Sequence, residues 1–316
     1  MPNGSGINHR KPMSTIMEKE PSTTSSSKSL NLPGGRAGET AYGYPRNFLG
    51  NRFVYVVVSP RARGLSIGIN FNPDKKCNFD CVYCEVDRTA PGRDQKLNID
   101  VMADELTATV NAAISGTLRD VPLYRNLPAE LLQLRHVTLS GDGEPTLSPV
   151  FAEALQTVAH IRALGRFPFF KIVLVSNATG FDLPEVQRGL KLLTRQDEVW
   201  AKLDVGTQSW MDVINKSQVP LDKILSNILL VARSRPVIIQ SLFASVDNAD
   251  PPVDQIEQYA LRLRELKEAG AQIPLVQIYS ASRPVHNTRC RHLPLRSLSQ
   301  IAQTVRRVSG LKAEVF

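Results

Sequence analysis

Residues 77–84 read Cys-Asn-Phe-Asp-Cys-Val-Tyr-Cys and hold three of the four cysteines of the chain. Three residues separate the first two cysteines, and two residues separate the second from the third. An apolar run at residues 65–71 comes shortly before them, which predicts a strand leading into a cysteine-bearing loop. Thiolates select zinc, copper(I) or iron–sulfur clusters, so this loop is a candidate metal-binding element.

The loop supplies three cysteine ligands, whereas a closed tetrahedral metal site needs four. Structural zinc sites add a second cysteine pair or histidines, and neither follows nearby. A cubane 4Fe–4S cluster held by three cysteines keeps one iron open, which can chelate the amino and carboxylate groups of S-adenosylmethionine. A zinc site completed by Cys290, the remaining cysteine, is the alternative.

The pattern C-x3-C-x2-C, with Tyr83 before the last cysteine, resembles the radical S-adenosylmethionine (radical SAM) superfamily. With the preceding Ser-Ile-Gly-Ile-Asn at residues 66–70, it is most similar to the iron–sulfur oxidoreductase subgroup related to the tRNA wybutosine-synthesis enzymes. The resemblance implies that Cys77, Cys81 and Cys84 bind one 4Fe–4S cluster and that S-adenosylmethionine is the second cofactor.

The same resemblance implies a reaction. A low-potential electron donor of the flavodoxin or ferredoxin type reduces the cluster, and S-adenosylmethionine is cleaved to methionine and a 5′-deoxyadenosyl radical. This radical then abstracts hydrogen from the substrate. The wybutosine enzymes carry a second cysteine set that Cys290 alone does not provide, so a single-cluster enzyme is expected here.

Composition predicts a folded core behind a polar leader. Residues 1–41 are rich in Ser, Thr, Gly, Pro and Lys and are predicted to be disordered, and residues 42–316 are predicted to form one core domain. The chain has no run of about 18 apolar residues and no secretory apolar segment at its N-terminus. We therefore expect no membrane association and a cytoplasmic location, where thiols stay reduced.

Strand-like and helix-like segments alternate about six times along the core. Strands are predicted at residues 53–58, 65–71, 136–140, 171–176, 199–204, 237–243, 275–280 and 313–316. Helices are predicted at residues 101–115, with Asp100 as N-cap, and at 150–164, 184–193, 221–232, 254–269 and 297–308. This alternation predicts an open, partial (β/α)6 barrel of parallel strands with outer helices, whose functional surface lies at the C-terminal strand ends.

Candidate cofactor-binding residues fall at those strand ends. Residues 141–145 read Gly-Asp-Gly-Glu-Pro and resemble the G-x-G-E-P element of the superfamily, which implies that Gly141, Gly143 and Glu144 bind the methionyl ammonium. An ordinary strand-to-helix turn is the alternative. By position, the resemblance further implies contacts to carboxylate or ribose from Ser176 and Asn177, to ribose from Gln240, and to adenine from Tyr83, Ile278 and Tyr279.

Lys202 and Asp204 end one predicted strand and point to the same side, because side chains alternate along a strand. Charged residues inside a barrel need partners. The two are therefore either a structural ion pair or catalytic residues, with Lys202 as a proton donor or an imine-forming amine.

Basic residues gather in two segments. The formal net charge is +8, and residues 283–312 contain no Asp or Glu but seven Arg and Lys residues. A second group, Arg46, Arg52, Arg61 and Arg63, precedes the cysteine loop. RNA requires such patches, although a solvated basic face has the same composition.

Three functions follow as hypotheses. The first is a radical SAM enzyme that modifies RNA, and the second is one that acts on a small molecule or on a protein. The third is a non-enzymatic zinc module. Cys290 is an unpaired loop thiol, a thiol that contacts substrate, or a fourth ligand.

Overall fold

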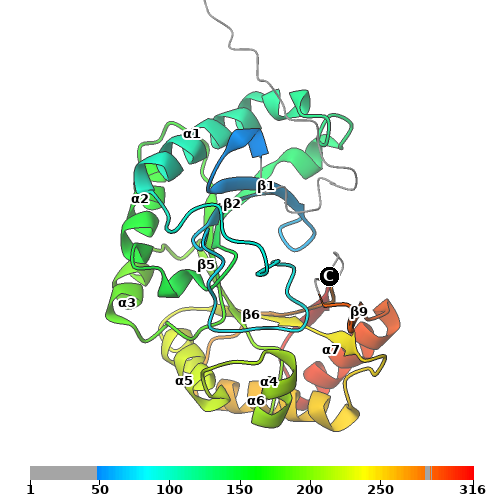
Figure 1. The fold of residues 1–316 in the computed structure, drawn as a ribbon. Helices are drawn as coiled ribbons and strands as arrows, with labels where there is room; N and C mark the ends of the chain where they lie inside the picture. The colour runs from blue at the N-terminus through cyan, green and yellow to red at the C-terminus, as the bar shows by residue number, and fades with distance from the viewer. Residues whose placement is uncertain (1–47, 282–284, 286) are drawn as a thin grey trace, which may run out of the picture. The chain divides into compact units, whose positions relative to one another are not determined.

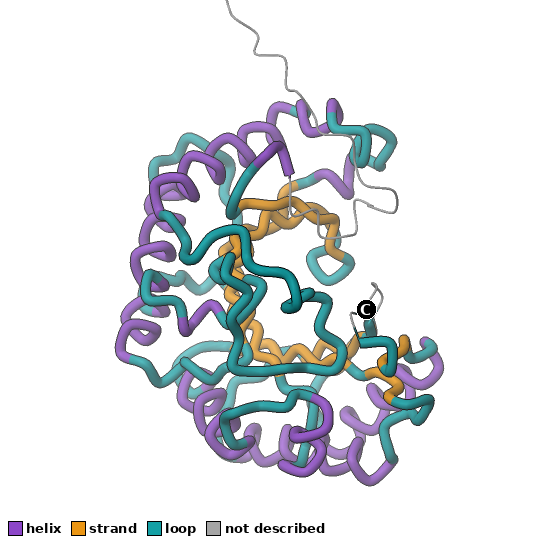
Figure 2. The backbone as a smooth tube through the Cα atoms, viewed as in Figure 1, coloured by secondary structure: helices purple, strands orange, loops and turns teal. Residues whose placement is uncertain are grey.

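The computed structural model describes residues 48–281, 285 and 287–316, all of which belong to one compact unit. Residues 1–47 lie outside it, so the predicted leader and the predicted start of the core at residue 42 are not described. The unit is a curled sheet with helices along its outer side, and Figure 2 shows the strands as an arc inside the helices. This is the predicted open half-barrel of parallel strands.

The sheet has eight strands in the order β1-β2-β3-β4-β5-β6-β8-β10, which keeps neighbours in the chain adjacent in space. β1 is antiparallel to β2, and every later pair is parallel. The strands are β1 Val54–Ser59, β2 Gly64–Asn70, β3 Leu134–Ser140, β4 Lys171–Ser176, β5 Glu198–Lys202, β6 Val237–Leu242, β8 Val276–Tyr279 and β10 Ala313–Val315.

Seven α-helices are described, and in Figure 1 they run around the outside of the sheet. They are α1 Ile99–Ser115, α2 Phe151–Ala163, α3 Pro184–Leu190, α4 Gln208–Ile214, α5 Leu221–Ala232, α6 Val253–Glu268 and α7 Leu295–Ser309. Short 3-10 helices are η1 Phe48–Gly50, η2 Thr117–Asp120, η3 Ala129–Leu132 and η4 Pro145–Leu147. None of the helices within the described ranges is long and apolar enough to cross a membrane.

The predicted elements are confirmed apart from short ones. The sequence did not predict α4, nor the antiparallel pair of β7 Ala244–Val246 and β9 Cys290–His292, because seven or three residues are too few to show a periodicity. The predicted N-cap is corrected. Asn98, not Asp100, caps α1, and its Oδ1 accepts a hydrogen bond from the Val101 backbone N–H at 3.0 Å.

The two faces of the sheet differ in chemistry. Ile67 and Leu139, on the face covered by helices, are fully buried. Their neighbours in sequence point to the concave face, where the Ser66 and Thr138 hydroxyls lie 2.8 Å apart. The concave face therefore carries hydroxyl groups at β2 and β3.

The turn between β1 and β2 reaches the opposite edge of the sheet (Figure 1). The guanidinium carbon of Arg61 lies 4.3 Å from the ring centroid of Tyr279 on β8. Arg63 forms an ion pair with Glu314 on β10, with 3.7 Å between nitrogen and oxygen. The two edges of the open barrel are bridged by this turn.

Candidate functional site

A cavity of about 180 Å³ opens at the C-terminal ends of β3, β4 and β5, where a parallel sheet normally binds ligands. All three cysteines of the 77–84 loop line it. The other predicted site residues on its wall are Tyr83, Gly141, Gly143, Glu144, Ser176, Asn177 and Lys202. Segments more than a hundred residues apart thus contribute to one site.

The cysteine loop is held against the end of α4. The backbone N–H of Val82 donates to the carbonyl of Ile214 at 2.9 Å, and that of Asp80 donates to the carbonyl of Asn215 at 3.0 Å. Backbone bonds on both sides of Cys81 fix the course of the loop. The short helix that sequence patterns did not predict is therefore one of its supports.

Gly143 lies directly against the same loop. A Cβ atom at this position would stand 1.7 Å from the backbone carbonyl oxygen of Lys76, the residue before Cys77. Only glycine permits that approach. We expected small residues here so that the backbone could approach a ligand, and the structure adds a second reason, which is contact with the cysteine loop.

Glu144 joins two strand ends. Its buried carboxylate accepts hydrogen bonds from the Thr146 backbone and hydroxyl at 3.0 and 2.5 Å, from the Ser176 hydroxyl at 2.6 Å and from the Asn177 backbone at 2.6 Å. Burial raises the pKa of Glu144, although these hydrogen bonds act in the opposite direction. Both oxygens bind protein groups, so Glu144 and Ser176 shape the cavity wall.

Asn177 connects β4 to the cysteine loop. Its side-chain amide donates to the Asn78 side-chain oxygen at 2.9 Å. Its own oxygen accepts a hydrogen bond from the Thr179 hydroxyl at 2.7 Å, and Asn78 donates to that hydroxyl at 2.9 Å. This closed set of three side chains positions the loop between its first two cysteines.

Asp204 is the centre of a buried network behind the cavity. Its side chain is only 1% exposed and accepts hydrogen bonds from the Tyr83 hydroxyl, from Asn215 Nδ2 at 2.9 Å and from the Leu242 backbone at 2.8 Å. Asn215 Nδ2 also lies 3.5 Å from the Cys81 sulfur. The hydroxyl of Tyr83 is thus bonded to protein, and Asp204 acts on the cysteine loop through Tyr83 and Asn215.

Lys202 extends from this network to the cavity wall. Its Nζ lies 3.3 Å from Asp204 Oδ1 and donates to the Tyr279 hydroxyl at 3.0 Å. Burial lowers the pKa of Lys202, but Asp204 and Tyr279 together raise it by more, so the net pKa lies above its usual range. Lys202 is an ammonium group at the cavity, paired with a carboxylate.

Gln240 and Ile278 are not among the residues that line the cavity. Gln240 donates to the Gln277 side chain at 3.3 Å and accepts from the Tyr279 hydroxyl at 3.4 Å. Ile278 is fully buried and lies between two residues that face the concave side, so its side chain points to the helices. The predicted contact of Ile278 with adenine would therefore be made by its backbone, and it stays a prediction.

The three cysteines share the cavity without meeting at one point. Burial raises the pKa of Cys77 to about 11 and that of Cys81 to about 12. Within the described ranges, no three His, Cys, Asp or Glu side chains converge as ligands of a single ion. A 4Fe–4S cluster binds each thiolate through a different iron, so its three thiolates do not have to meet at one point.

Cys290 lies away from this cavity. It is buried in β9 and pairs with Val246 of β7 in the separate two-stranded sheet. It is not among the residues lining the cavity. The alternative in which Cys290 completes a zinc site with the cysteine loop is therefore not supported.

The sequence did not point to Asn215, Asn78 or Thr179. Asn78 stands inside the cysteine motif and was available as a candidate by position. Asn215 and Thr179 follow elements whose ends carry no distinctive pattern.

No family model matches the chain. It is similar to two proteins called UPF0026 protein from Helicobacter pylori, with 30% identity over 142 residues for strain J99 and 32% over 143 residues for strain 26695. These alignments cover 44% of this chain and 39% of each relative. The similarity thus spans well under half of the curated relatives.

Two solved structures share the fold. A structure of TYW1 with a lysine-pyruvate adduct bound superposes with a TM-score of 0.53 and 15% identity, covering 83% of this chain and 86% of that one. SuiB from Streptococcus suis, bound to S-adenosylmethionine, gives 0.52 and 14%, covering 77% of this chain and 49% of that one. Both share the fold of this chain, which confirms the predicted open half-barrel of parallel strands.

Proposed function

We propose that the protein is a radical SAM enzyme with one 4Fe–4S cluster bound by Cys77, Cys81 and Cys84. When bound, the cluster and S-adenosylmethionine supply reductive cleavage to methionine and a 5′-deoxyadenosyl radical that removes hydrogen from the substrate. The electron comes from a low-potential donor of the flavodoxin or ferredoxin type. That the enzyme is an oxidoreductase and that it is cytoplasmic are parts of this proposal.

One observation carries the proposal. The three cysteines, the glycine-containing turn after β3 and the polar end of β4 line a single cavity at the C-terminal strand ends. The sequence places these segments far apart, and the fold brings them together. The SuiB structure, which contains S-adenosylmethionine, supports the same choice of cofactor.

The residues of this chain then have distinct roles. Gly141 and Gly143 offer backbone at the cavity wall, where the methionyl ammonium is expected. Glu144 and Ser176 hold the ends of β3 and β4 together, and Asn177 holds the cysteine loop. These residues orient the cofactors and exclude water, which is the task of the protein when cofactors carry the chemistry.

Lys202 is proposed as a cation and proton donor at the cavity. The TYW1 structure contains a lysine-pyruvate adduct, and an imine-forming role for Lys202 would need a neutral amine. The Asp204 carboxylate and the raised pKa keep Lys202 protonated, which disfavours that role in this chain. Asp204 is proposed to act by holding Lys202 and Tyr83.

RNA is retained as a proposed substrate, with less support than the sequence alone offered. Arg46, Arg283 and His286 lie outside the described residues. Five of the described residues of the two basic segments are ion-paired, in the pairs Arg52–Asp94, Arg63–Glu314, Arg289–Asp247, Arg307–Glu257 and Lys312–Glu314. Paired cations neutralise fewer phosphates, so a small-molecule or protein substrate is the second candidate.

The test is formation of 5′-deoxyadenosine by anaerobically reconstituted, dithionite-reduced protein. Wild type is expected to form it and to bind about four irons per chain, as a 4Fe–4S cluster requires. Cys81→Ala should form none, whereas Cys290→Ala should behave as wild type because Cys290 lies in another sheet. Addition of bulk RNA should stimulate the wild type if RNA is the substrate.

Two results would contradict the proposal. One is an iron-loaded wild type that forms no 5′-deoxyadenosine. The other is a purified protein that contains one zinc ion and no iron, which would restore the zinc module.

A further inference from the structure

We propose that Arg61 and Lys202, which both contact the Tyr279 side chain, form a site for an anionic group of the substrate, a carboxylate or a phosphate. The inference rests on the proposed function and specifies the substrate class for the same cavity. Arg61 is a binding residue in this proposal, and the anion fixes the orientation of the rest of the substrate.

Arg61 is held over an aromatic ring. Its guanidinium carbon lies 4.3 Å from the ring centroid of Tyr279, which is within the range of a cation–π contact. Stacking restrains the guanidinium plane and leaves its edge for hydrogen bonds. An arginine held this way is pre-organised to bind a planar carboxylate or a phosphate with two parallel hydrogen bonds.

Arg61 lacks the partner that its neighbours have. Its buried Nε has no hydrogen-bond acceptor, and no carboxylate forms an ion pair with it among the residues that the structure describes. By contrast, Lys202 pairs with Asp204 and Lys171 pairs with Glu198 on the same concave face. One positive charge of this face thus remains uncompensated, which is the electrostatic condition for binding an anion.

Lys202 places the second cation next to the cavity. Its Nζ lies 5.4 Å from the Tyr279 ring centroid and 3.0 Å from the hydroxyl of the same ring. Lys202 also lines the cavity that holds the three cysteines. An anion that bridges Arg61 and Lys202 would therefore anchor a substrate next to the wall of the cavity that Lys202 forms.

The cysteine-lined cavity is the proposed place of the cluster and S-adenosylmethionine. The substrate anion is therefore placed beside this cavity, at Arg61 and Lys202, and not among the cysteines. The anion is a carboxylate or a phosphate, and the test separates the two.

The experiment measures binding of matched probes to the full-length chain by ligand-observed NMR at constant ionic strength, with and without the reconstituted cluster. The probes are propionate against propionamide, and methyl phosphate against methanol. Because a charge-assisted hydrogen bond contributes more than a neutral one, wild type should bind at least one anion about tenfold more tightly than its neutral analogue. The preferred anion identifies the group.

Variants locate the site. Arg61→Gln should lower the preference for the anion over its neutral analogue about tenfold. Arg61→Lys should keep part of this preference, because lysine keeps the positive charge but lacks the paired N–H groups of the guanidinium. Arg63→Gln is the matched control, since Arg63 is 78% exposed and pairs with Glu314 outside the cavity. It should bind the probes as wild type does.

Two outcomes would overturn the inference. Wild type with equal affinity for anion and neutral analogue has no anion site. An Arg61→Gln protein that is less stable but keeps the full preference for the anion shows that Arg61 only bridges the sheet edges. Formation of 5′-deoxyadenosine is measured separately, so a failure of the radical chemistry is distinguishable from a failure of the anion site.

Discussion

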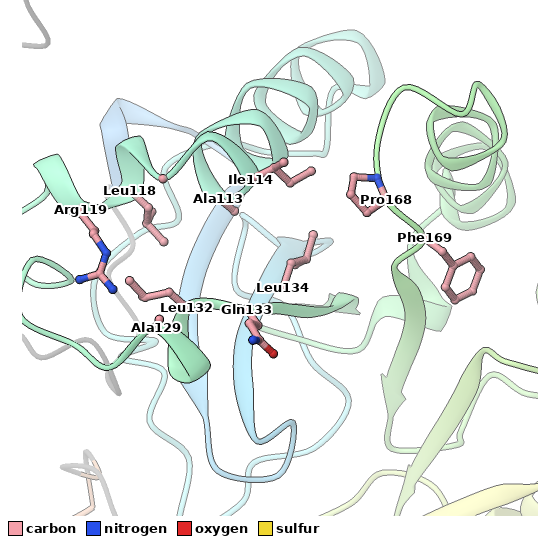
Figure 3. A pocket seen from close by; sticks show the side chains of 11 residues that line it. Ala113, Ile114, Leu118, Arg119, Ala129, Leu132, Gln133, Leu134, Pro168 and Phe169 are labelled. Carbon is pink, nitrogen blue, oxygen red and sulfur yellow. The ribbon is translucent and has the colours of Figure 1, made fainter.

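The sheet has a hollow at each end of β3 and β4, and the two differ in both size and chemistry. At the N-terminal ends, a hollow of about 340 Å³ is lined by apolar side chains such as Ile114, Leu132 and Leu134, with Arg119 at one side (Figure 3). At the C-terminal ends, the smaller hollow of about 180 Å³ holds three cysteines and Lys202. The larger volume lies at the N-terminal end, whereas the cysteines and the lysine lie at the C-terminal end.

An aspartate stands at each end of β5, and the two aspartates have different partners. Asp197 precedes the strand and binds Arg162 through two hydrogen bonds of 2.5 and 3.0 Å, with a side chain that is fully buried. Asp204 follows the strand and binds Tyr83, Asn215 and Lys202 next to the cavity. Asp197 joins structural elements, whereas Asp204 supports the groups around the cysteines.

The largest expected effect is on stability at the N-terminal end. Asp197→Ala leaves Arg162 buried without its partner and removes acceptors from the Ile172 and Thr194 backbones, so the free energy of unfolding should fall by about 3–5 kcal/mol. Urea unfolding measures it. Glu185→Ala, which removes a surface ion pair with Arg188, should cost under about 1 kcal/mol. If both variants lost the same free energy of unfolding, the buried ion pair of Asp197 would contribute no more than a surface pair.

Gly143→Ala tests whether the functional end also has a steric requirement. The new Cβ would meet the Lys76 carbonyl oxygen at 1.7 Å, so we expect a loss of about 3 kcal/mol and a lower iron content after reconstitution. Gly116→Ala is the control. Gly116 has φ +83° but no atom within 4 Å of a new Cβ, so only a backbone cost of about 1 kcal/mol is expected and iron binding should be unchanged.

Asp204→Asn tests the C-terminal end of β5. It keeps the size of the side chain but removes the charge that holds Lys202 and the Tyr83 hydroxyl, and we expect the rate of 5′-deoxyadenosine formation to fall roughly 10- to 100-fold. The rate is measured per bound cluster. Asp197→Asn should keep the wild-type rate per folded chain. If both variants lose the rate equally, the two aspartates do not differ in role.

The smallest effect concerns pH. Burial, with Lys171 and Arg61 nearby, lowers the pKa of His136 to about 3, so His136 is neutral in the folded protein at pH 5.5. The unfolded chain takes up that proton below its pKa of about 6.5, so the contribution to stability is present above pH 6.5 and is lost as pH falls. Between pH 7.5 and 5.5 the loss should be about 1.4 kcal/mol.

His136→Gln provides the matched measurement, because it removes the titrating group and leaves the other histidines in place. Its unfolding free energy should fall less than that of wild type over the same pH range. Parallel pH profiles for the two proteins would show that folding does not lower the pKa of His136.

The sequence predicted the parts of this molecule that depend on local patterns. Apolar runs and helical periodicity placed the long strands and helices, and the cysteine spacing located the loop that lines the cavity. Residues at strand ends, such as Ser176 and Lys202, were found because the C-terminal ends of parallel strands lie at one edge.

The remainder depends on contacts between distant segments. The hydroxyl of Tyr83 binds Asp204, a contact that spans 121 residues and that the sequence did not predict. Both oxygens of Glu144 accept hydrogen bonds from groups at the end of β4, which the sequence did not predict either. Side-chain partners across such separations carry no pattern within a single sequence, so only the fold reveals which polar groups are already engaged.

The bridge between Arg63 and Glu314 has a consequence for biosynthesis. It joins residues that are 251 positions apart in the chain, and β10 is the last strand to be added to the sheet. A chain growing on the ribosome therefore cannot bridge its sheet edges until residue 314 has emerged. Up to that moment, the turn between β1 and β2 lacks its ion pair with β10, so the last strand closes this contact only after the rest of the sheet has been synthesised.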